Sequence, residues 1–92
     1  MNKFENLEVW KQSVRLCADL YIHLKDSKEY GFKDQITRSA LSIPSNIAEG
    51  CEHDSLKETL RFIGYAKASA GELQTQLTVG ALTGFIDPTQ AE

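Results

Sequence analysis

The sequence predicts an all-α, up-and-down antiparallel bundle with three long helices present and the fourth largely missing from the chain. Apolar residues recur every three or four positions in three long segments, which is typical of packed helices. Short polar connections separate these segments, and short connections favour antiparallel neighbours. We expect helices at about 7–25, 32–50 and 56–83, with a fourth beginning at 87, in a single domain of residues 1–92.

The first predicted helix begins after Asn6, a residue type favoured at N-caps. Three residues, Val9, Leu16 and Leu20, form a second apolar edge, so we expect contacts with more than one neighbour. Its main apolar stripe consists of Leu7, Trp10, Val14, Cys17, Tyr21 and Leu24.

The second predicted helix contains a proline. Pro44 lacks a backbone donor and clashes with the preceding turn, yet the apolar period continues to Ile47. We therefore expect one kinked or locally loosened helix that ends near Gly50. Its apolar stripe is Phe32, Ile36, Ala40, Ile43 and Ile47.

The third predicted helix opens with Ser55 and Glu58, spaced as a capping box, and stops at Gly84. Mid-helix glycine costs up to about 1 kcal/mol relative to alanine, so we expect close helix packing to compensate for it. The glycines concerned are Gly64, Gly71 and Gly80.

The final residues carry the signals of a new helix. Asp87 is a suitable N-cap, Pro88 suits the first helical position, and Gln90 follows at the third. We interpret the chain as a bundle lacking most of its fourth helix. The alternative is a frayed tail on a complete three-helix protein.

The composition of the chain argues against several classes of function. The net charge of −3 argues against a strong phosphate-binding surface, although a local basic patch stays open. The N-terminus has no apolar run of signal-peptide length, and no segment reaches the roughly 20 apolar residues that span a bilayer. Cys17 and Cys51 form no C-x-x-C motif. We expect a cytoplasmic protein with no membrane contact.

A polar row accompanies the apolar stripe of the second helix, and a comparable row follows the third. One interpretation is a buried or interfacial hydrogen-bond network in which Arg38 pairs with Glu72 or Glu49. The alternative is a solvated face. The first row is Gln35, Arg38, Ser42, Asn46 and Glu49, and the second is Arg61, Ser69, Glu72 and Gln76.

Catalytic and metal-binding motifs are lacking in the sequence. His23 and His53 stand outside H-x-x-x-H and H-E-x-x-H patterns, and no P-loop, G-x-S-x-G or G-x-G-x-x-G occurs. We therefore predict no enzyme activity, no cofactor and no small-molecule substrate. An enzyme built on Arg38, Glu49 and Glu72 is the third alternative.

The run Ser42-Ile43-Pro44-Ser45-Asn46-Ile47-Ala48-Glu49-Gly50 resembles the motif of the bacterial four-helix-bundle family, the 23S rRNA intervening-sequence protein family. Residues 4–10 and 61–77 resemble its opening and its third helix. The resemblance implies a four-helix bundle, a ring-shaped homo-oligomer, expected to be a pentamer, and no established enzyme activity. A related branch, the accessory protein of diversity-generating retroelements, binds a reverse transcriptase and nucleic acid through a basic surface.

Two function hypotheses follow. The first is a non-enzymatic, self-associating scaffold whose partner is an RNA or a ribonucleoprotein. The second is a nucleic-acid-binding accessory protein of the retroelement type, which the acidic balance of the chain argues against. Nucleic-acid contacts would come from Lys3, Lys11, Arg15 and Lys25.

Overall fold

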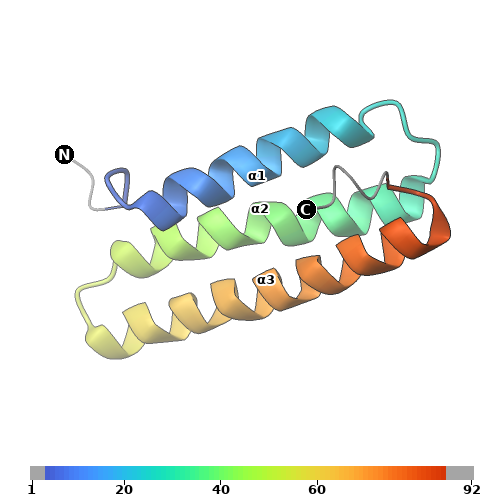
Figure 1. Ribbon diagram of the computed structural model, residues 1–92. Coiled ribbons are helices and arrows are strands. Elements are labelled where there is room, and N and C mark those ends of the chain that lie inside the picture. Colours follow the sequence, from blue (N-terminus) through green and yellow to red (C-terminus); the bar gives the residue numbers. More distant parts are fainter. Residues whose placement is uncertain (1–3, 87–92) are drawn as a thin grey trace.

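The computed structural model describes residues 4–86 of the chain. Three helices run antiparallel: α1 (Glu8–Leu24), α2 (Tyr30–Cys51) and α3 (Leu56–Thr83) (Figure 1). Residues 4–86 contain no strand. The predicted all-α architecture is confirmed. The expected start of a fourth helix at 87 lies outside the described residues.

The helix ends differ in detail from the prediction. Leu7, not Asn6, is the N-cap residue of α1, and its side chain makes no capping hydrogen bond. At α3 the Ser55 hydroxyl accepts a hydrogen bond from the Glu58 N–H at 3.4 Å. The Glu58 carboxylate binds Arg61 rather than turning back to residue 55, so only half of the predicted capping box forms. Gly84, with φ of 83°, ends the helix in a left-handed conformation.

Helix α2 continues through Pro44 as a single element, as the apolar period predicts. The helix begins at Tyr30 rather than near Phe32 and ends at Cys51. Ile43 and Ile47 are buried on either side of the proline. Their packing anchors both halves of the helix, which offsets the hydrogen bond that proline cannot donate.

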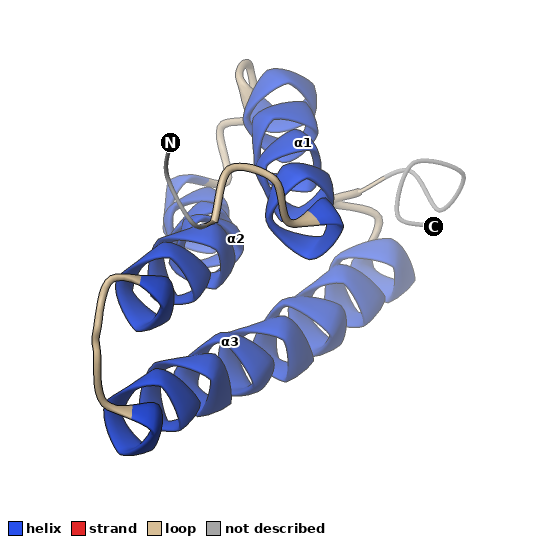
Figure 2. Cartoon of the chain, turned by 90° about the vertical axis from the view of Figure 1, so that its left-hand side faces the viewer, coloured by secondary structure: helices blue, strands red, loops and turns tan. Residues whose placement is uncertain are grey.

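Helix α2 lies between the other two helices and packs against both. No Cα of α1 comes within 8 Å of a Cα of α3. Viewed from the end of the molecule, α1 and α3 diverge on two sides of α2 (Figure 2). The fold therefore leaves an open side between α1 and α3.

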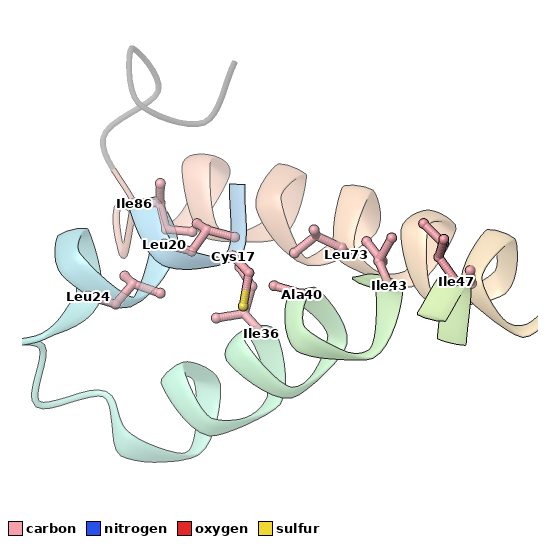
Figure 3. Close-up of a cluster of buried hydrophobic side chains, with 10 residues drawn as sticks. Cys17, Leu20, Leu24, Ile36, Ala40, Ile43, Ile47, Leu73 and Ile86 are labelled. Atoms are coloured by element: carbon pink, nitrogen blue, oxygen red, sulfur yellow. The ribbon is translucent and has the colours of Figure 1, made fainter. Parts of the chain in front are cut away.

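The core is a thin layer along α2 (Figure 3). Ile36 is its one large side chain with essentially no exposed surface in the described chain. Burial also raises the pKa of the Cys17 thiol. The buried apolar residues are Cys17, Leu20, Leu24, Ile36, Ala40, Ile43, Ile47, Ala66, Leu73 and Ile86.

Much of the predicted apolar stripe of α1 remains exposed. Leu7, Val14 and Tyr21 each keep a large part of their surface in contact with solvent. Helix α1 lies closer to α2 than to α3, since no Cα of α1 is within 8 Å of one of α3, although buried side chains of all three helices belong to one core cluster. The apolar edges of α1 therefore remain available to another surface.

The three mid-helix glycines differ in how closely other residues pack against them. A Cβ on Gly80 would lie 2.7 Å from Ile86 Cδ1 and 2.8 Å from Phe32 Cζ, so close packing is confirmed there. At Gly64 and Gly71 a Cβ would meet nothing within 4 Å, and the same expectation is wrong. Both lie on the exposed part of α3.

Candidate functional site

Polar side chains from α2 and α3 line a shallow groove along the junction of the two helices. We call this set the polar seam. The groove has a volume of about 270 Å³. The antiparallel register brings serines and glutamines of one helix beside polar residues of the other. The polar seam consists of Gln35, Arg38, Ser39, Ser42, Ser69, Glu72 and Gln76.

Short hydrogen bonds join the two helices in the middle of the seam. The hydroxyls of Ser42 and Ser69 lie 2.7 Å apart. Asn46 donates from Nδ2 to the Ser42 carbonyl at 2.8 Å and to the Ser42 hydroxyl at 2.9 Å. Either serine can donate in this pair, because a hydroxyl oxygen that accepts from Asn46 still has a second lone pair. One turn away, the Ser39 hydroxyl donates to Glu72 Oε1 at 3.2 Å.

Arg38 does not form the expected pair with Glu72 or Glu49. Its Nε donates to Asp34 Oδ2, one turn earlier on the same helix, at 3.0 Å. Glu49 stands eleven residues beyond Arg38, about 16 Å along the helix, and is too distant. It instead lies 3.5 Å from His53 Nε2. Arg38 and Glu72 share the groove without an ion pair between them.

Replacing Arg38 by alanine is expected to change the free energy of unfolding by no more than about 0.5 kcal/mol. The side chains of Arg38 and Asp34 are 78% and 61% exposed, so water solvates both charges. Urea unfolding of wild type and variant, compared under dilute conditions, measures the difference. A loss of about 3–5 kcal/mol would instead indicate a buried ion pair.

The row pattern also does not predict the surroundings of two further seam residues, Ser39 and Gln76. Ser39 is buried and bonded to Glu72, yet it stands outside the predicted row. Its position three residues before Ser42 is the signal that could have found it. Gln76 Oε1 is buried and has no hydrogen-bond partner among the described residues.

Arg61 belongs to a separate cluster near the α2–α3 connection. It donates to Glu58 Oε1 from Nη2 at 2.6 Å and from Nε at 3.0 Å, and to the Tyr65 hydroxyl at 3.3 Å. The hydrogen bond to Glu58, followed by that to Tyr65, raises the pKa of the Arg61 guanidinium. Phe62 stacks on the His53 ring with centroids 5.1 Å apart. These contacts stabilise the end of the helical hairpin.

Among the described residues, the basic side chains expected to touch nucleic acid lie at two separate places. Lys11 and Arg15 share a surface groove with Glu8. Lys25 lies fourteen residues beyond Lys11, about 21 Å along α1 and its C-terminal cap. Lys3 lies outside the described residues.

A larger cavity of about 550 Å³ adjoins Lys25 at the α1–α2 connection. Tyr21, Tyr30 and Lys33 line it together with Lys25. The Lys33 ammonium donates to the Lys25 carbonyl at 3.0 Å and lies 5.8 Å from the centre of the Tyr30 ring. A cation at this carbonyl complements the C-terminal end of the α1 dipole.

An apolar groove of about 250 Å³ opens between α1 and α3, with α2 as its floor. Val9 of α1 faces Ile63 of α3 across it. Its walls are aliphatic, including the stem of Lys67. We call it the apolar groove, and its lining is Val9, Ile43, Ile47, Ile63, Ala66, Lys67 and Ala70.

The fold and these surfaces define a small helical protein built around helix faces that are open to contact. The described residues include no group of three or more His, Cys, Asp or Glu side chains able to hold a metal ion. No helix among them has the length and apolar character to cross a bilayer.

The chain belongs to the 23S rRNA-intervening sequence protein family, because the family model of that description matches residues 5–92. The predicted family is thus confirmed over nearly the whole chain. It is a family of small helical proteins without known catalytic activity. No curated protein matches the chain.

Proposed function

We propose that the protein is a non-enzymatic scaffold that associates with copies of itself and serves an RNA or a ribonucleoprotein. The observation that carries this proposal is the apolar groove on the open side between α1 and α3. Family membership supports the link to RNA, and the resemblance implies a pentamer as the form of the assembly. A ring of this kind uses head-to-tail contacts between two different faces of each copy.

The energetic argument rests on uncovered apolar surface. Fully burying one aliphatic side chain contributes roughly 1.5–3 kcal/mol. Contiguous apolar patches above a few hundred Å² are rare on monomers and mark interaction sites. A contact that covers the apolar groove and its rim therefore favours association. Exposed aliphatic residues occur on all three helices and at the N-cap of α1: Leu7, Val9, Val14, Leu16, Ile22, Leu41, Leu56, Leu60, Ile63, Val79 and Leu82.

Self-association is expected at micromolar concentration, with a mass well above the 10.3 kDa of one chain. Val9→Asp, which places a charge in the apolar groove, should weaken association at least about tenfold, since charges are depleted from interface cores. Ile22→Asp is the matched control, because Ile22 is exposed on α1 and lies outside the groove lining. Sedimentation velocity measures the degree of self-association of wild type, Val9→Asp and Ile22→Asp. A monodisperse wild-type monomer would contradict the proposal.

The alternative function is a nucleic-acid-binding accessory role. The cavity at the α1–α2 connection favours it, because tyrosine rings can stack on bases and lysines can neutralise phosphates. Against it stand Asp34 in the same cavity wall and the net charge of −3. We expect weak binding of unrelated duplex DNA at moderate salt in fluorescence anisotropy. A tight complex there would favour the accessory role over the scaffold.

A further inference from the structure

We propose that the cavity at the α1–α2 connection binds a single nucleotide, with its base against a tyrosine ring and its phosphate beside Lys25 and Lys33. The volume of about 550 Å³ lies within the range of roughly 300–1,000 Å³ that is typical of small-molecule sites. The cavity shares no lining residue with the apolar groove or the polar seam. This inference therefore goes beyond the proposed self-association and does not depend on it.

The placement of the Lys33 ammonium is the first argument. It donates to the Lys25 carbonyl at 3.0 Å and lies 5.8 Å from the centre of the Tyr30 ring. These two contacts hold the end of a long, flexible side chain at the cavity. An ammonium has three N–H donors, and Lys33 has no other acceptor and no ion pair within residues 4–86. Two donors therefore remain for a ligand.

Lys25 supplies a second cation at the same cavity. Its carbonyl accepts the hydrogen bond from Lys33, so the two residues are held side by side. Lys25 has no ion pair in the described part of the chain. Lysine binds phosphate as a point charge, and a phosphomonoester carries a charge of about −1.5 to −2 at neutral pH. Two adjacent ammonium groups suit such a group.

The local charge balance is favourable although the chain carries a net charge of −3. Asp34 is the one acidic residue among those that line the cavity. Its Oδ2 accepts a hydrogen bond from Arg38 Nε at 3.0 Å, so an adjacent cation offsets its charge. Asp26 and Glu29, in the connection itself, are not lining residues. The cavity is therefore locally cationic.

Aromatic rings from both helices are the second argument. Tyr21 of α1 and Tyr30 of α2 line the cavity, and their side chains are 48% and 67% exposed, so ring surface is available to a ligand. An aromatic side chain can stack on any nucleobase, because every base has a π face. A free phosphate or a small carboxylate would leave these rings unused. Rings beside ammonium groups favour a ligand that joins a planar base to a phosphate.

The spacing of the cations favours one nucleotide over a bound strand. Lys11, the nearer of the two cations in the groove on α1, to Lys25 by sequence after Arg15, stands fourteen residues earlier, about 21 Å along the helix. Proteins that bind a single strand follow its backbone with a continuous positively charged groove. The cavity therefore suits a free nucleotide or the terminal nucleotide of an RNA strand, which present the same base and phosphate.

Isothermal titration calorimetry with adenosine 5′-monophosphate tests the site. Wild type should bind this nucleotide at least about tenfold more tightly than adenosine, which lacks the phosphate. Lys33→Gln and Lys25→Gln should each weaken its binding about threefold or more, because each removes one cation. Tyr21→Leu should weaken it about fivefold, through the loss of stacking. Lys57→Gln, the same charge change at an exposed position of α3, is the control and should bind like wild type.

Two short single-stranded RNAs, with and without a 5′-phosphate, distinguish the two sources of the nucleotide. Binding of adenosine 5′-monophosphate that Lys33→Gln weakens supports a free nucleotide, and binding of the phosphorylated RNA alone supports a strand end. The inference is overturned if neither binds at millimolar concentration or if adenosine binds as tightly as its monophosphate. It is also overturned if Lys57→Gln weakens binding as much as Lys33→Gln.

Circular dichroism checks that each variant folds. Lys25→Gln leaves the hydrogen bond from Lys33 to the Lys25 carbonyl in place, so it decides the outcome if Lys33→Gln unfolds. Sedimentation velocity of wild type tests self-association separately. A failure of nucleotide binding therefore leaves the proposed function standing, and a monomeric wild type leaves the nucleotide site standing.

Discussion

Replacing Ile36 by alanine is expected to lower the free energy of unfolding by about 2–5 kcal/mol. Ile36 is 0% exposed and lies in the thin layer between α2 and its two neighbours. The substitution removes buried methyl and methylene groups and leaves a cavity that the helices can close only in part. A small domain has only about 5–15 kcal/mol of stability, so this loss is a large share of the total.

The matched control is Ile22→Ala, the same substitution on α1 at a side chain that is 68% exposed. It should change stability by no more than about 0.5 kcal/mol. Urea unfolding followed by circular dichroism, at a fixed protein concentration, measures both variants. Equal losses for Ile36 and Ile22 would show that the core is not where the structure places it.

Replacing Gly80 by valine is expected to destabilise the protein by about 1–3 kcal/mol. The first added carbon alone would lie 2.7 Å from Ile86 Cδ1 and 2.8 Å from Phe32 Cζ, well inside contact distance. Either the segment after α3 or the start of α2 must then move. Overpacking therefore outweighs the gain in helix propensity that any replacement of glycine brings.

Gly71→Ala, in the same helix, is expected to have the opposite effect on stability. An added Cβ at Gly71 meets nothing within 4 Å, so the substitution should stabilise the chain by up to about 1 kcal/mol. Thermal unfolding of wild type and the two variants shows directly whether each substitution raises or lowers the stability. A stabilising Gly80→Val would mean that residue 86 does not pack against α3 as described.

The positions of the helices were predictable because periodicity and capping are local signals. The apolar period through Ile47 correctly outweighed Pro44, and the glycine at position 84 correctly marked the end of α3. Which apolar residues are buried was less predictable. Leu7 and Val14 follow the same period as Cys17, yet they are exposed because α1 packs closely against α2 alone.

The contacts within the polar seam were also only partly predictable from the sequence. Spacing alone identified the rows that hold Ser42 and Ser69, but not the register that pairs them across two helices. The partner of Arg38 could have been found, since Asp34 stands four residues earlier and such pairs are neighbours on a helix. Ion pairs between helices depend on a relative placement that no local spacing encodes.

The wide spacing between α1 and α3, which have no Cα atoms within 8 Å of each other, bears on how the molecule partially unfolds. We expect that α1 can detach from α2 while the α2–α3 hairpin keeps its seam hydrogen bonds, because those bonds involve no residue of α1. Such a partial opening is expected to require less free energy than global unfolding. It would expose Cys17, which is buried against α2 in the closed state. The thiol thus serves as a built-in reporter of the detachment of one helix.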